Sequence, residues 1–139
     1  MKLEKEFVVS RARDAVAQVF DQDETYAALF PDTRLASSKG GTRETRTSYS
    51  ALGQSREIRF VFRTQADGNV RFEKICDGNV WRSLDGEVVL TASGADRTRV
   101  LLRMEGRTRA FVPELAIRGP LREQLEQMAE ALRGQIESA

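Results

Sequence analysis

The chain offers few side chains for the common forms of enzyme catalysis. Its 139 residues include no histidine, the side chain most often used as a general acid or base near neutral pH and the commonest zinc ligand. The one cysteine, Cys76, therefore has no imidazole to activate its thiol, so we expect it to be unreactive. A single cysteine also cannot form an internal disulfide, so the chain does not require an oxidising compartment.

Three side chains could still supply an inward-facing acid or base: Glu44, Tyr49 and Lys74. Lys74 comes two residues after Phe72, so in a strand both side chains point to the same, apolar side. An unpaired ammonium group would be costly there. It would need a carboxylate partner, such as Glu44 or Glu73, or an anionic ligand head group. Alternatively, a bulge changes the register or Lys74 lies beyond the rim of the sheet.

An acidic cluster, Asp21, Asp23 and Glu24, precedes a predicted helix and could suggest a cation site. Acidic residues at a helix N-terminus are stabilised by the helix dipole without any metal. We therefore predict no metal and no cofactor.

Arginines recur along the predicted strands and could form a basic stripe on the outer face of a sheet. They are Arg43, Arg46, Arg59, Arg63 and Arg71. Such a stripe is one footprint of nucleic-acid binding, but the net charge is only +1 and no outward aromatic residues are interleaved. We instead expect these side chains to pair across strands with Glu44, Glu57 and Glu73, and we predict no nucleic-acid partner.

Composition indicates a globular domain. Apolar residues make up 40% and charged residues 31% of the chain, which is typical of folded proteins, and the length suits one domain over residues 1–139. No apolar run approaches the ~20 residues needed to span a bilayer, so we expect no stable membrane insertion. The opening "MKLEKEFVVS" lacks the apolar stretch of a signal peptide, and we predict a cytoplasmic protein.

The first 31 residues predict a strand and two helices. Alternation predicts a strand over Lys2–Val9, and Ser10 is a plausible N-cap for a helix over Arg11–Phe20. Asp21 and Glu24 resemble a capping box for a second helix through Tyr26–Phe30, which Pro31 should end.

From residue 33 onward, glycine-containing turns separate runs typical of strands. "DG" pairs at Asp67, Asp77 and Asp85 favour tight hairpin turns. The predicted strands are Leu35–Lys39, Thr42–Leu52, Arg56–Gln65, Val70–Asp77, Val80–Leu84, Glu87–Ala92 and Thr98–Thr108, and two of them could be one bent or bulged strand because Val80–Leu84 is short.

The C-terminal segment predicts a long amphipathic helix that begins at Gly119-Pro120. Its apolar stripe comprises Leu121, Leu125, Met128, Leu132 and Ile136. This stripe must pack on an apolar surface. The sheet face with Ile58, Phe60, Phe62 and Phe72 is the expected partner.

This order of elements resembles the START-like, or SRPBCC, superfamily over nearly the whole chain. The echoes are "EKEFVVSRARDAVAQVFDQDETYAALFPD", "LDGEVVLTASGADRTRVLLRMEG" and the final "LREQLEQMAEAL". Members often carry a tryptophan in the first helix, where this chain has Val16 or Val19. The resemblance implies an α+β helix-grip fold: a curved antiparallel sheet wrapped around a long C-terminal helix, with two short helices after the first strand. It also implies a cavity between sheet and helix, which the family uses for lipids, polyketides or aromatic small molecules.

We therefore expect the protein to bind a small hydrophobic or amphipathic ligand, as a monomer or homodimer. The residues expected to line the cavity are Tyr26, Phe30, Tyr49, Phe60, Phe62, Phe72, Met104, Leu125, Met128 and Leu132, with Lys74 as a candidate polar group. Two alternatives stay open: a cyclase-like or dehydratase-like enzyme using the same cavity, and an interaction module that binds no ligand.

Overall fold

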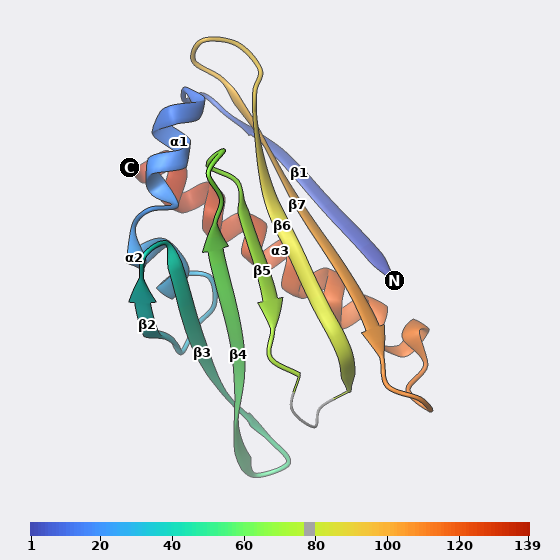
Figure 1. The fold of residues 1–139 in the computed structure, drawn as a ribbon. Coiled ribbons are helices and arrows are strands. Elements are labelled where there is room, and N and C mark those ends of the chain that lie inside the picture. The colour runs from blue at the N-terminus through green and yellow to red at the C-terminus, as the bar shows by residue number, and fades with distance from the viewer. Residues whose placement is uncertain (77–79) are drawn as a thin grey trace.

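The computed structural model describes residues 1–76 and 80–139. In chain order, the elements are β1 (Lys2–Val9), α1 (Arg13–Val19), α2 (Asp23–Ala27), β2 (Thr33–Lys39), β3 (Thr42–Ala51), β4 (Gln54–Thr64), β5 (Val70–Lys74), β6 (Trp81–Ala92), β7 (Thr98–Thr108) and α3 (Glu114–Ser138). The strands form one antiparallel sheet in the order β1-β7-β6-β5-β4-β3-β2 (Figure 1). This is the predicted helix-grip arrangement.

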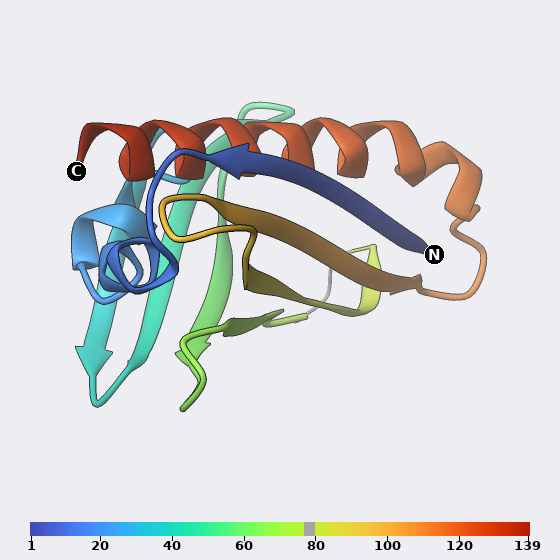
Figure 2. The same cartoon turned by 90° about the horizontal axis from the view of Figure 1, so that it is seen from above.

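The sheet is strongly curved, and α3 lies across its open side (Figure 2). The helix runs closest to β1 and β7, while α1 and α2 cover the end of the sheet where α3 finishes. The apolar stripe predicted for α3 is buried, and it joins the core that the concave face of the sheet supplies. The core therefore lies between the sheet and α3.

Strand alternation explains which side chains enter this core. Phe60 and Phe62 of β4 point to the concave side with Phe72 of β5, and all three are 3% exposed or less. Their rings contact one another, with centroids 5.5–6.2 Å apart. Arg63, the residue after Phe62, faces outward and pairs with Glu73 at 2.8 Å. The aromatic face of β4 and β5 thus forms part of the core.

Asp85-Gly86 does not form a turn, because β6 continues through it. The alternative that two of the predicted strands are one bulged strand is confirmed, with the register shift between Trp81 and Ser83. Gly86 is instead required by close packing inside the strand. A Cβ at Gly86 would lie 2.2 Å from the carbonyl oxygen of Arg103 and 2.5 Å from the Phe72 ring. The Asp77-Gly78 turn and the predicted end of a strand at Asp77 lie outside the described residues.

The helix ends also differ from the prediction. Ala12 and Gln22 stand at the N-caps of α1 and α2, and neither Ser10 nor Asp21 caps a helix. The terminal helix begins at Glu114, after Pro113, and Pro120 lies within it. Proline removes one helical hydrogen bond and bends the helix, and the first turns of α3 are tilted against the rest (Figure 2).

Candidate functional site

A groove of about 390 Å³ lies between α3, strands β3 and β4, and the loop after α2. It exists because α3 packs closest to β1 and β7 at one edge of the sheet. The curved sheet therefore leaves space between the helix and β3–β4. The lining residues are Phe30, Pro31, Asp32, Thr47, Ser48, Tyr49, Ser50, Ile58, Phe60, Gln124 and Gln127.

The groove has an apolar part and a polar part. Phe30, Ile58 and Phe60 supply apolar surface, whereas Thr47 and Tyr49, on the inward side of β3, supply hydroxyl groups. Gln124 and Gln127 of α3 supply amides that can both donate and accept hydrogen bonds. Among the described residues that line the groove, Asp32 is the one charged at neutral pH, and none is a lysine or an arginine. The groove can thus satisfy neutral polar groups but offers a carboxylate no cation.

The loop at the mouth of the groove is fixed to β3. The backbone N–H of Ser48 donates to the carbonyl oxygen of Asp32 at 3.0 Å, and the hydroxyls of Thr33 and Thr47 are 2.7 Å apart. Asp32 has φ 56°, a left-handed conformation that aspartate tolerates better than most residues. These contacts hold the Asp32 carboxylate at the rim.

Arg43 anchors the two short helices rather than facing outward as predicted. It is 7% exposed, and its guanidinium donates to Asp23 Oδ1 at 2.9 Å and to the carbonyl oxygen of Asp21 at 2.8 Å. The same group lies 4.9 Å from the centre of the Tyr26 ring. The prediction failed because a buried arginine is stable only when its donors are satisfied, and those acceptors come from another part of the chain.

Tyr26 belongs to this anchor and not to the groove. Its hydroxyl donates to the carbonyl oxygen of Phe20 at 2.6 Å, and its ring lies 5.0 Å from that of Phe62. Burial raises the pKa of the Tyr26 phenol, so it stays protonated as a donor. The tyrosine fixes α2 against the sheet behind the groove.

Of the ten residues expected to contact ligand, Phe30, Tyr49 and Phe60 line the groove. The other seven are 3% exposed or less and lie in the packed core: Tyr26, Phe62, Phe72, Met104, Leu125, Met128 and Leu132. That any of these seven contacts a ligand stays a prediction. Lys74 is half-buried, opposite Phe60 in register, and does not line the groove.

Glu44 lies on the outer face, away from the groove. Hydrogen bonds from Arg59 and Arg46, at 3.0 and 3.1 Å, lower the pKa of its carboxyl group. The suggestion that Glu44 supplies an inward acid or base is therefore wrong, because strand alternation sends it to the side opposite Arg43 and Thr45. Cross-strand pairing with glutamates is confirmed for Arg59 and Arg63. Arg46 instead pairs with Glu44 of its own strand, two residues earlier.

Sequence reasoning missed the polar lining of the groove. The overlooked residues are Asp32, Thr47, Ser48, Ser50, Gln124 and Gln127. A signal was present, since the exposed positions of α3 are mostly charged and the two glutamines stand out as uncharged. The run Thr-Ser-Tyr-Ser at 47–50 is likewise uncharged between Arg46 and Arg56.

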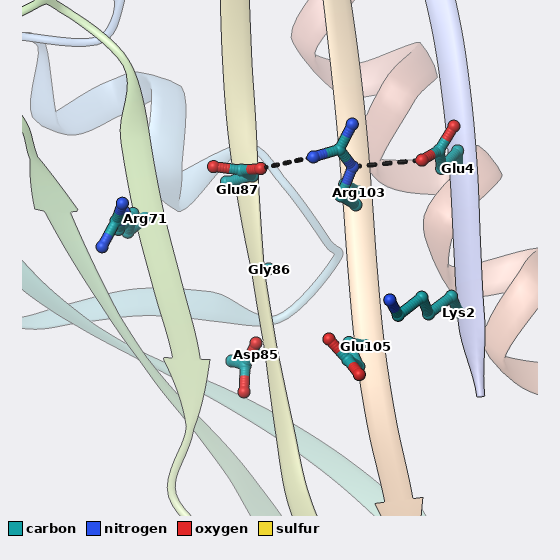
Figure 3. A pocket seen from close by; sticks show the side chains of 8 residues that line it. All are labelled: Lys2, Glu4, Arg71, Asp85, Gly86, Glu87, Arg103 and Glu105. Atoms are coloured by element: carbon teal, nitrogen blue, oxygen red, sulfur yellow. Dashed lines mark hydrogen bonds and ion pairs between the residues drawn. The ribbon is translucent and has the colours of Figure 1, made fainter.

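A second hollow, of about 420 Å³, lies on the convex face of the sheet (Figure 3). Two rows of charged residues cross four strands there. In one row Arg103 pairs with Glu4 at 3.1 Å and with Glu87 at 2.9 Å. Among the described residues no group of acidic or cysteine side chains could hold a metal ion. Among the described residues, charged side chains and Gly86 line this hollow and no large apolar side chain does, so it is a poorer candidate for an apolar ligand than the groove.

The comparisons bear on the fold. No family model matches the sequence, and no curated protein matches it either. Solved structures do match over almost the whole chain. A START superfamily protein from Mycobacterium smegmatis is 18% identical, with a TM-score of 0.71 and coverage of 99% of this chain and 97% of that one.

The chain has the START-like fold. Two further START-like structures are the Zhui aromatase/cyclase from Streptomyces sp. R1128 and norcoclaurine synthase from Thalictrum flavum. The first is 17% identical over 98% of this chain and 90% of that one, with a TM-score of 0.73. The second is 14% identical over 100% and 87%, with a TM-score of 0.75. At these identities the likeness shows the fold and leaves the function to the residues of the groove.

Within residues 1–76 and 80–139, no helix is both long enough and apolar enough to cross a membrane.

Proposed function

We propose that this START-like protein binds a small amphipathic molecule, uncharged or cationic, in the groove between α3 and β3–β4. The proposal depends on one observation: apolar and hydrogen-bonding groups line the groove together, and no basic side chain is among the lining residues that the structure describes. The volume of about 390 Å³ falls within the range of small-molecule sites. Phe30, Ile58 and Phe60 would cover the apolar body of the ligand, and Tyr49 with the two glutamines would bind its polar groups.

The charge of the groove supports a preference against anions. A carboxylate transferred from water into a groove without a cation loses hydration and gains no ion pair. It would also meet the Asp32 carboxylate at the rim. An ammonium group would instead be attracted to Asp32. Because Asp32 is exposed, we expect this attraction to contribute at most ~1 kcal/mol.

The first test uses three fluorescent probes with one apolar ring system, ending in an amide, an ammonium group or a carboxylate. We expect the amide and ammonium probes to bind and the carboxylate probe to bind more weakly. Asp32→Asn should remove the preference for ammonium over amide, a change of up to roughly fivefold, without abolishing binding of the amide probe. Binding is measured by fluorescence titration.

A matched pair of variants locates the binding site. Ile58→Trp fills the groove, and we expect it to weaken binding of the amide probe at least roughly tenfold. Val61→Trp lies on the same strand but faces outward, so it should bind like the unmodified protein. If the unmodified protein binds none of the probes, or if both variants behave alike, the groove is not the ligand site.

A further inference from the structure

Two large apolar side chains are fully exposed at turns where glycine is normally favoured. Leu52 is 101% and Phe111 105% exposed, and their φ angles are 52° and 71°. A left-handed φ is unfavourable for a bulky side chain, and exposure of a large apolar group to water is unfavourable as well. Neither residue contributes to the core. Both therefore carry two costs that nothing in the fold offsets.

The types of the two turns show why Leu52 and Phe111 are unfavourable at these positions. Ala51 pairs with Gln54, so Leu52 and Gly53 form a two-residue hairpin turn with positive φ at both positions, which favours Asn-Gly. In the second turn the Val112 N–H donates to the Arg109 carbonyl oxygen at 3.1 Å. Phe111 occupies the third position of that turn, where glycine is usual.

The two turns lie at the same end of the molecule. They are the β3–β4 hairpin, at the bottom of Figure 1, and the connection from β7 to α3, at its lower right. Leu115, in the first turn of α3, is 87% exposed beside the second of them. This end therefore presents separate apolar tips rather than a flat apolar patch.

Basic side chains accompany the tips. Arg82, Arg107 and Arg109 are exposed, and Arg82 and Arg109 line one surface hollow. None of the three forms an ion pair with a residue that the structure describes. The nearby Glu114 lies 3.9 Å from the N-terminal ammonium group. A local excess of positive charge thus lies beside the second turn, where β6 begins and β7 ends, although the whole chain carries only +1.

We propose that this end of the molecule docks reversibly on an anionic lipid bilayer. Isolated apolar tips can enter the interface between head groups and acyl chains, while the arginines bind lipid phosphates. A rigid protein partner would need a continuous complementary surface, and the separate tips do not form one. The docking does not require the groove to hold a ligand.

The test is sedimentation with vesicles of phosphatidylcholine mixed with phosphatidylglycerol, compared with vesicles of phosphatidylcholine alone. We expect binding to the mixed vesicles only, weakened by salt. The double variant Leu52→Asn/Phe111→Gly supplies residues that suit each turn, so it should fold at least as stably and bind at least roughly tenfold more weakly. Arg82→Gln and Arg109→Gln should each weaken binding roughly fivefold.

Val8→Ser is the matched control, because Val8 is 41% exposed near the other end of the sheet. It should bind vesicles like the unmodified protein. The proposal is overturned if the unmodified protein stays in solution with mixed vesicles, or if the double variant binds them equally well. Self-association that disappears in the double variant, without vesicle binding, would also overturn it by assigning the tips to a contact between copies of the chain.

Discussion

At the scale of single residues, the sequence shows which side chains are apolar but not which polar ones are buried. Arg43 is an example: its strand alternates Thr, Arg, Glu and Thr, and no periodicity says that the arginine points inward. What decides its position is the arrival of Asp23 and two carbonyl groups from the helices, 20–23 residues earlier in the chain. Similarly, Tyr49 and Phe60 were predicted to line a cavity and do line the groove, whereas Gln124 can be placed there only once the position of α3 is known.

Two carboxylates should make stability depend on pH. Hydrogen bonds from Arg43 and Ser38 lower the pKa of Asp23 below its ordinary 3.8, and those from Arg59 and Arg46 lower that of Glu44 below 4.5. A lowered pKa in the folded state stabilises the protein above the unfolded value, and this stability is lost as the pH falls through the folded value.

We therefore expect Asp23→Asn/Glu44→Gln to be less stable than the unmodified protein at neutral pH and to lose less stability between about pH 5 and pH 3. Urea unfolding across this range measures the difference. Glu123→Gln, which removes an exposed carboxylate of α3, serves as the control and should follow the unmodified profile. If the stability of the double variant and that of the unmodified protein changed in parallel with pH, these two carboxylates would not be the source of the pH dependence.

At the scale of elements, the order and period of the segments predicted most of the sheet. The strand Thr98–Thr108 was predicted with the correct bounds, because its alternation is regular and its turn contains glycine. The sequence around Asp85-Gly86 misled for a physical reason. A glycine can serve a turn or a close contact inside a strand, and only the partner strands decide which.

Gly86 should therefore tolerate no side chain. We expect Gly86→Ala to destabilise the protein by at least ~2 kcal/mol, because its Cβ would overlap the backbone of β7 and the Phe72 ring. Gly134→Ala in α3 is the opposite case, since nothing lies within 4 Å of its Cβ. It should stabilise the protein by ~0.5–1 kcal/mol through helix propensity. Thermal unfolding of both variants checks the pair, and equal effects would be inconsistent with it.

The rows of charge on the convex face offer a second prediction at this scale. Glu73, Asp85 and Glu105 lie opposite one another on β5, β6 and β7, and like charges in cross-strand positions are destabilising. Asp85→Lys would face two glutamates, and we expect a gain of ~0.2–1 kcal/mol for each pair. Glu87→Lys, in the adjacent row between Arg71 and Arg103, should instead be destabilising. Urea unfolding that ranks the two variants in the reverse order would contradict this account.

At the scale of the whole molecule, the START-like fold could be predicted from the order of elements, because strand, two short helices, antiparallel strands and a long helix leave few arrangements. The predicted partner of α3 was only partly right. Its buried residues do share a core with Phe60 and Phe62, but the helix runs closest to β1 and β7. Sequence patterns say that a helix face is buried; they do not say which half of a curved sheet it covers. The groove lies beside the strands that the helix leaves uncovered, so its position could not be predicted from the sequence.

The pairing of β1 with β7 has a consequence for synthesis. Lys2 faces Glu105 and Phe7 faces Val100, so the first strand made has no partner until more than two-thirds of the polypeptide has left the ribosome. The aromatic interior then still lacks its cover, because α3 follows last. Contacts this distant along the chain form slowly, and unfinished chains with exposed apolar strands aggregate. We expect nascent chains that stop before residue 114 to depend on chaperones.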